Sequence, residues 1–423
     1  MTPGLQQVGL GYEGDLPIGW KIVPAKQVCT KITDGTHDTP IPTPVGQPFI
    51  TAINVKDGKI DFSKCLYVDE QTHNSIYKRC NPQRGDLTIV NIGAGVGDCG
   101  YVEVDFEFSL KNVALLKPDP QKLDSRFLLH LHQSRRARIS HTVKAGGAQP
   151  FLSLAELRRL PILLPNLPEQ RQIAEILATW DRAIETVEAL VANARAQKKA
   201  LMQSLLTAKK RLPGFADAWM STTLDKAAQI IVSNVDKKSA DTERAVRLCN
   251  YMDVYRSDRI EADMDFMAAT AAEAQIRKFG LRVGDVLITK DSETPDDIAI
   301  PSFVGSTAPD LVCGYHLAII RPRKETDGLF LKFYFEHPHT RHYFASRANG
   351  ATRFGLTIDA IQTAPIALPS FDEQQRVAEV IGAAELEIAR LHPIAASLRQ
   401  EKAALMQQLL TGKRRVKIEV QVA

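Results

Sequence analysis

The stretch PILLPNLPEQ at residues 161–170 decides the fold, because it occurs a second time as PIALPSFDEQ at residues 365–374. The offset between the two copies is 204 residues (from 161 to 365), and it continues without a gap to ALMQSLLT at 200–207 and ALMQQLLT at 404–411. A repeat with one fixed offset determines the architecture before any local assignment of helix or strand. The chain therefore consists of two half-molecules, each ending in a closely matched tail.

Each tail carries the heptad pattern of a coiled coil, with apolar residues at alternating spacings of four and three. The predicted seam includes Leu177, Ile184, Val191, Lys198 and Leu201 in the first tail and Ile381, Ile388, Leu398, Lys402 and Leu405 in the second. The two lysines occupy the same position of the repeat, and a polar residue on such a seam fixes register at some cost in stability. We predict two long helices that pair antiparallel; a helix packed only onto its own domain is the alternative.

The helix starts are marked by capping signals. Asn166 stands three residues before Glu169, and Ser370 stands three residues before Glu373, which is the spacing of a capping side chain and the acid that follows it. A helix from there to about residue 210 is roughly 60 Å long at about 1.5 Å per residue. Pro393 lies inside the second tail, so we expect that helix to bend or break there.

The region ahead of each tail reads as mixed α/β. Strands are predicted at 87–90, 101–106 and 113–116 in the first half and at 286–289 and 317–320 in the second, and helices at 125–140 and 329–347. The two halves match only loosely here, as in the shared Gly-Asp pairs at Gly85 and Gly284. The fold class is therefore mixed α/β, with two diverged globular regions, two long helices and a pseudo-twofold internal repeat.

Composition restricts the class of protein. The 423 residues are long enough for two to three domains, and 53 Lys and Arg against 49 Asp and Glu give a formal charge of only +4. Any nucleic-acid surface must therefore be local. No apolar run is long enough to span a bilayer, and Met1 to Gly14 has no secretory pattern, so a cytoplasmic location is expected. The six cysteines form no C-x-x-C pair, and we predict no metal site.

No catalytic motif stands out. The run Gly93-Ala94-Gly95-Val96-Gly97 follows a strand, but a nucleotide loop should open a helix, so we predict a hairpin turn. The closely spaced histidines at 130 and 132, and at 337, 339 and 342, lack an acid or cysteine in a ligand pattern. The sequence contains no P-loop, nucleophile elbow, zinc-protease helix or amino-methylating Asn-Pro-Pro-aromatic run. We therefore predict a chain that is not itself an enzyme and that holds no cofactor.

Local basic charge precedes each tail. Arg and Gln side chains read guanine and adenine edges bidentately, while Lys and further Arg hold phosphates. The alternative for any single residue is a solvated helix face. The candidate DNA-binding residues of these segments are Arg135, Arg138, Lys144 and Gln149 in the first half and Lys290, Arg341, Arg347, Thr352 and Arg353 in the second.

Two diverged regions, each followed by a proline-rich entry into Glu-Gln and a heptad helix ending in Leu-Leu-Thr, resemble the DNA specificity subunit of type I restriction-modification systems. The loop Asp34 to Pro40, with Gly35 and His37, is similar to the glycine-histidine loop near the start of many target-recognition domains. The second half has no Gly-x-His loop between Ile230 and Asp236, so that role is not carried over there.

The resemblance implies that each globular region reads one half of a split, asymmetric DNA target. The paired helices then act as a ruler longer than one duplex turn of about 34 Å. Two methyltransferase subunits dock on the helices, and endonuclease subunits are possible partners. S-adenosylmethionine, ATP and magnesium belong to those partners, which carry out adenine methylation and cleavage.

The expected domains follow the repeat. They are an N-terminal extension (1–15), a first target-recognition domain (16–165), a central coiled-coil helix (166–212), a second target-recognition domain (213–368), a C-terminal coiled-coil helix (369–412) and a basic tail (413–423). Two other classes of protein remain open at this point. A self-sufficient DNA methyltransferase would bind adenosylmethionine, and a coiled-coil scaffold would not bind DNA.

Overall fold

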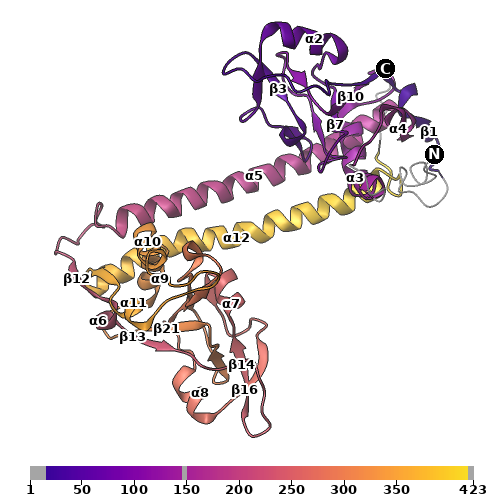
Figure 1. Ribbon diagram of the computed structural model, residues 1–423. Coiled ribbons are helices and arrows are strands. Elements are labelled where there is room, and N and C mark those ends of the chain that lie inside the picture. The colour runs from indigo at the N-terminus through magenta and orange to yellow at the C-terminus, as the bar shows by residue number, and fades with distance from the viewer. Residues whose placement is uncertain (1–15, 145–149, 418–423) are drawn as a thin grey trace. The chain divides into compact units, whose positions relative to one another are not determined.

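The computed structural model describes residues 16–144 and 150–417. The chain divides into two compact units, a first unit of residues 1–188 and 394–423 and a second unit of residues 189–393. Each unit thus combines one globular region with one part of each long helix (Figure 1). Within the described residues, no helix is both long and apolar enough for a membrane span.

The first unit is built on a four-stranded antiparallel sheet. Its order is β2 (Cys29–Asp34), β10 (Val113–Pro118), β7 (Leu87–Val90) and β8 (Cys99–Tyr101). All four residues of β7 are buried, which explains their uninterrupted apolar and β-branched character. Helix α3 (Ser125–Lys144) packs against β7 and β8.

Smaller elements complete the first unit. A three-stranded sheet has the order β6 (Leu66–Val68), β3 (Gln47–Ile50), β9 (Ser109–Leu110), and helix α2 (Glu70–Cys80) contacts β9. The first unit also contains the short antiparallel pair β4 (Val55–Lys56) and β5 (Lys59–Ile60) and the helix α4 (Leu154–Arg159). The Gly93–Gly97 run joins β7 to β8 as an antiparallel hairpin, as predicted, and both of those glycines have positive φ angles.

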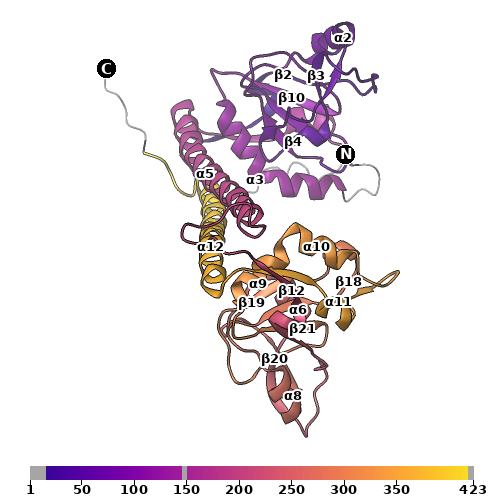
Figure 2. The ribbon, with the colours of Figure 1, turned by 90° about the vertical axis from the view of Figure 1, so that its left-hand side faces the viewer.

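The second unit contains a five-stranded sheet of order β13 (Ala228–Val232), β21 (Leu317–Pro322), β17 (Val286–Thr289), β19 (Pro301–Val304) and β15 (Arg259–Ile260). A three-stranded sheet has the order β16 (Met267–Ala271), β14 (Arg244–Cys249), β20 (Leu311–Cys313). Helix α9 (Gly328–Glu336) packs on β17 and β19, and α7 (Tyr251–Arg256) contacts β17. Figure 2 shows α8 (Glu273–Phe279) at the opposite end of this unit from α10 (Pro338–Ala345).

The two units enter their long helices in the same way. Strand β1 (Lys21–Pro24) pairs antiparallel with β11 (Pro161–Leu164), and β12 (Met220–Thr223) pairs antiparallel with β23 (Pro365–Leu368). The capping signals are confirmed, because the N–H of Glu169 donates to Asn166 Oδ1 at 2.9 Å and the N–H of Glu373 to Ser370 Oγ at 3.4 Å. The helices that follow are α5 (Leu167–Leu205) and α12 (Phe371–Leu409), with 39 residues each.

Two local expectations need correction, and a third, the bend or break at Pro393, loses one of its two outcomes. Only Cys99–Tyr101 forms a strand, and residues 102–106 do not extend it. The helix expected at 329–347 is two helices, because His337 caps α10 and Pro338 at its first turn cannot continue α9. Pro393 does not break α12, which remains helical on both sides of it.

Candidate nucleic-acid interface and helix-pair ion clusters

Each unit contains an antiparallel pairing of α5 with α12, and ion pairs mark its register. In the second unit, Lys198 Nζ lies 2.5 Å from Glu385 Oε2, and in the first unit Lys402 Nζ donates to Asp181 Oδ1. These two pairs are copies of each other, because adding 204 to 198 and to 181 gives 402 and 385. In each unit, the lysine predicted on the seam thus bonds to an acid of the opposite helix.

A second pair repeats in the same way at the helix ends. Arg211 binds Glu373 through two bonds of 2.6 Å in the second unit. Arg415 binds Glu169 at 2.6 and 2.9 Å in the first unit. Both glutamates are only 1% exposed, so these bidentate pairs are directional bonds to buried acceptors. Two different globular regions are thus attached to a helix pair of one repeated design.

The seam residues differ in burial. Leu177, Ile184, Val191, Ile381 and Lys402 are buried, whereas Lys198, Leu201, Ile388, Leu398 and Leu405 are partly buried. Leu201 packs on the core of the second unit and Leu405 on that of the first. The helices therefore pack against their own globular regions as well as against each other within each unit.

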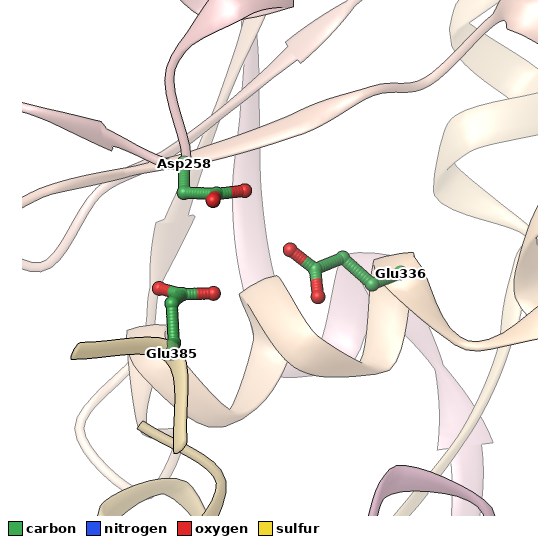
Figure 3. Close-up of side chains that lie close together, drawn as sticks. All are labelled: Asp258, Glu336 and Glu385. Atoms are coloured by element: carbon green, nitrogen blue, oxygen red, sulfur yellow. The ribbon is translucent and has the colours of Figure 1, made fainter. Parts of the chain in front are cut away.

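The second unit extends its lysine pair into a cluster of three carboxylates, Asp258, Glu336 and Glu385, which lie close together in Figure 3. Lys198 lies 2.9 Å from Glu336, and the fully buried Lys332 lies 2.5 Å from the same carboxylate and 3.6 Å from Asp258. Burial alone would lower the pKa of Lys198, but Glu336 and Glu385 outweigh it and raise that pKa. Two ammonium groups thus neutralise most of the charge that could attract a cation.

The first unit places a histidine where the second has this cluster. His130 Nδ1 lies 3.9 Å from Asp181 and is only 2% exposed. Burial and then the charge of Lys402 lower the pKa of His130 to about 4, so it is neutral at pH 7. Burial likewise lowers the pKa of His132, which bonds the carbonyl of Gly97 at 3.0 Å, to about 4. The two units therefore support the same helix pairing with different chemistry.

The glycine-histidine loop of the first unit is held by a polar network. His37 lies 3.0 Å from Asp34 and 3.1 Å from Asn112, and Arg79 lies 2.5 Å from the other oxygen of Asp34. A Cβ at Gly35 would lie 1.9 Å from the carbonyl oxygen of Leu110, so only glycine fits there. The imidazole of His37 is 46% exposed, which leaves an ordered polar group at the surface of the loop.

In the second unit, the candidate Lys290 directly follows β17, the strand whose place in the sheet matches that of β7 in the first unit. Lys290 lies 2.9 Å from Asp291, whose second oxygen lies 2.6 Å from His316. The ring of Tyr315 lies beside that of His316, with centroids 3.6 Å apart and a tilt of 41° between the rings, and Tyr315 is 38% exposed. Lys290 is therefore tied into an ion pair, and an aromatic ring accompanies it at the surface.

The remaining candidate residues fall into distinct environments. Arg347 is exposed and lies over the ring of Tyr343 at 4.1 Å, and Thr352 and Arg353 are exposed in the loop before β22 (Phe354–Gly355). Arg341 is instead held by the carbonyl groups of Ile298 and Asp296, at 2.5 and 2.6 Å. Arg353 and Thr352 thus remain the freest of the second-unit candidates to reach a ligand.

In the first unit, one candidate must be corrected. Arg135 is 3% exposed and donates to the carbonyl of Pro161 at 2.7 Å, so it is a buried residue and not a base-reading one. Arg138, one turn further along α3, is exposed. The side chain of Lys144 and the residue Gln149 lie outside the part of the chain that is described.

Comparison with known proteins shows similarity to one family. Residues 17–193 match the family model of the type I restriction modification DNA specificity domain. The chain is 26% identical over 433 aligned positions to the MjaX type I restriction enzyme specificity subunit of Methanocaldococcus jannaschii. The alignment covers 96% of this chain and 96% of the relative. The first half of the chain is thus similar to this specificity domain, and the chain is similar over nearly its whole length to a type I specificity subunit.

Three further comparisons also match proteins of type I restriction systems. The EcoKI specificity subunit of Escherichia coli K12 is 24% identical over 43% of this chain and 40% of its own length. The fold is similar to that of the type I S subunit from M. genitalium, at 15% identity and a TM-score of 0.60 over 94% of this chain and 98% of that one. A structure of a type I R-M system gives a TM-score of 0.52 at 20% identity over 95% of this chain and 100% of that chain.

One arrangement in the first unit has the residue types of a catalytic triad. His73 lies 3.0 Å from Ser109 Oγ and 3.1 Å from Glu107. Ser109, however, is fully buried, so its hydroxyl cannot reach a substrate. Burial also raises the pKa of Cys80 to about 11 and that of Cys99 to about 12, which keeps these thiols protonated.

Sequence reasoning missed the acids that complete the pairing of α5 with α12 in each unit. Asp181 and Glu385 lie beside the seam and were hidden among the many charged residues of the tails. The sequence did contain a signal for them, because Asp181 and Glu385 are two acids separated by 204 residues. The same offset separates the two seam lysines. Lys332 gave no such signal, because its burial depends on contacts made only in the folded second unit.

Proposed function

We propose that this specificity subunit reads a bipartite, asymmetric DNA sequence, one half-site with the globular region of each unit. The observation that carries the proposal is the duplication itself. The helix pairing repeats residue for residue in Lys198–Glu385 and Lys402–Asp181, whereas the attached regions differ. The same helix pairing thus carries two globular regions with different surfaces, as recognition of two different half-sites requires.

The candidate surfaces support this assignment. The first unit offers the ordered His37 loop and the exposed Arg138, and the second offers Arg347, Thr352 and Arg353. Helices of 39 residues are about 60 Å long at about 1.5 Å per residue, which exceeds one duplex turn of about 34 Å. A gap of unread base pairs between the half-sites is therefore expected.

Catalysis belongs to partner subunits in this proposal. Two methyltransferase subunits dock on the helices and use S-adenosylmethionine, and endonuclease subunits that use ATP and magnesium can join them. The chain itself binds none of these cofactors and works in the cytoplasm. The buried Ser109 and the protonated buried thiols are consistent with a chain that supplies recognition only.

The experiment is selection of random duplex DNA by the purified chain alone and with its methyltransferase partner, followed by sequencing of the bound fraction. A two-part motif with an unread gap supports the proposal. Binding of adenosylmethionine by the chain alone would favour a self-sufficient methyltransferase. No DNA binding even at low salt, where phosphate contacts are strongest, would favour a scaffold.

A further inference from the structure

A cavity of about 220 Å³ lies in the first unit between α3 and the C-terminal end of α12. Its polar lining consists of Ser134, Arg135, Arg138, Gln407, Thr411 and Lys413, and Leu131, Met406 and Leu410 complete it. The lining includes three cations and no carboxylate. A single water molecule needs about 10–15 Å³ of cavity volume. The cavity is many times larger than that, so it has room for a tetrahedral oxyanion.

The decisive observation is the state of Arg135. Its Nη1 donates to the carbonyl of Pro161, but among the described residues its Nη2 has no hydrogen-bond partner although it is buried. Burial and then the charge of Arg138 lower the pKa of Arg135 to about 9. A buried guanidinium without a counter-charge is costly, and a free buried N–H of this kind calls for a partner that residues 16–144 and 150–417 do not supply.

The other two cations are also uncommitted. In the part of the chain that the structure describes, neither Arg138 nor Lys413 forms an ion pair, and both are exposed at this cavity. We propose that the cavity is a binding site for a small phosphate-class anion, held by Arg135 from inside and by Arg138 and Lys413 from the mouth. A planar guanidinium with a free N–H edge beside an ammonium group suits a phosphate oxygen pair.

The second unit provides an internal comparison. Gln203, Leu206, Thr207 and Lys209 repeat the α12 side of the cavity at the 204-residue offset. The α3 side is repeated only in part, because Arg341 stands where the first unit has Arg138 but is bound to the carbonyl groups of Ile298 and Asp296. Asp124 and Asp327 occupy equivalent places, since their N–H groups bond Gln170 and Gln374, and eleven residues beyond them stand Arg135 and Pro338 respectively. A proline supplies no charge, so the site is specific to the first unit.

The inference goes beyond DNA recognition, because it does not depend on which residues read bases. An anion bound here joins the recognition region of the first unit, through α3, to the end of α12. Binding to the folded state alone would stabilise that unit according to ligand concentration. Phosphate would thereby tighten the attachment of α12 to this region.

The test uses the full chain in phosphate-free buffer, titrated with inorganic phosphate by calorimetry and thermal unfolding, with sodium chloride at equal ionic strength as the reference. We expect one saturable site and a melting temperature that rises with phosphate. Arg138→Gln and Lys413→Gln should each raise the Kd at least fivefold. Lys209→Gln, the matched change in the second unit, should leave the Kd within twofold.

Arg135→Met should abolish the phosphate response, and circular dichroism checks that this variant folds. If it does not fold, Arg138→Gln and Lys413→Gln, which change exposed residues, still test the proposal. A nucleoside triphosphate that binds more tightly than phosphate, and loses affinity in Lys413→Gln, would identify the terminal phosphate of a nucleotide as the source. Absence of a saturable site, an equal effect of Lys209→Gln, or stoichiometric displacement of phosphate by duplex DNA would overturn the proposal.

Discussion

Lys198 of α5 donates to the carboxylate of Glu385 on α12 at 2.5 Å, at a polar position of a mainly apolar seam. The first unit repeats the bond between Lys402 and Asp181. A polar pair in an apolar seam adds little net stability, because both charges must be desolvated. It does penalise other registers, since any slip would bury an unpaired charge. The repeated pair is therefore a register device that both halves of the chain share.

The first prediction concerns this pair. Lys198→Met leaves Glu336 and Glu385 to share the single ammonium group of Lys332, and removal of one partner from a buried pair costs about 3–5 kcal/mol. We expect a lower urea midpoint for the second unit. Lys402→Met should cost less, because Asp181 is 37% exposed and can be hydrated. The double variant Lys198→Met with Glu385→Met should recover part of the loss; an additive or larger loss would contradict the pairing.

A second prediction concerns the packing of each helix end. Leu205 and Leu409 are 3% and 2% exposed and lie in the cores of the second and first units. Replacing either with alanine should cost about 2–5 kcal/mol through lost burial and the cavity that remains. The control is Leu190→Ala on the exposed face of α5, where Leu190 is 48% exposed and a change within about 0.5 kcal/mol is expected. Equal midpoints for Leu409→Ala and Leu190→Ala would refute the packing.

A third prediction concerns pH. The pKa values of His130 and His132 are about 4 in the folded chain, against about 6.5 when unfolded. The unfolded state therefore takes up protons first, and the stability of the first unit falls as the pH drops from about 6.5 toward 4. For the fully buried His132 this amounts to about 3 kcal/mol. Chemical unfolding at several pH values should show a shallower slope for His132→Gln than for the parent chain; an identical slope would show that His132 is not the titrating group.

The fourth prediction concerns independent reading of the half-sites. Arg353→Ala should alter or weaken only the second half-site in cells that also carry the partner subunits, as mapped by methylation sequencing. If Arg353 contacts a base edge, one position relaxes at a cost of about 1–3 kcal/mol. If it contacts phosphate, all sequences weaken and the salt slope falls by about one. A change confined to the first half-site would show that the two regions are assigned the wrong way round.

Much of the fold could be predicted because its signals are periodic and occur twice. The helix starts at Asn166 and Ser370, the seam, and the strands at 87–90 and 286–289 all depend on local chemistry that the sequence displays directly. The prediction of a strand at 101–106 was wrong beyond Tyr101. Alternating apolar and polar residues suggest a strand, but a strand also needs a neighbouring strand to pair with. Pro393 lies inside the continuous helix α12, although the low helix propensity of proline argued against a helix there.

The candidate site was less predictable, since it depends on burial. Arg135 and Arg138 are indistinguishable in a basic stretch of sequence, yet one lies inside the unit and the other outside. The face of α3 that packs on the sheet decides between them. The partner of Lys198 could not be inferred either, because it required the antiparallel register that the folded helices supply.

The most direct test of the central claim is a methylome of cells that express the unaltered chain with its methyltransferase partner, compared with cells that express the partner alone. The account predicts methylation that depends on the chain, at one asymmetric motif made of two specified parts separated by a fixed number of unread base pairs. A contiguous or palindromic motif, or the same methylation without the chain, would contradict it.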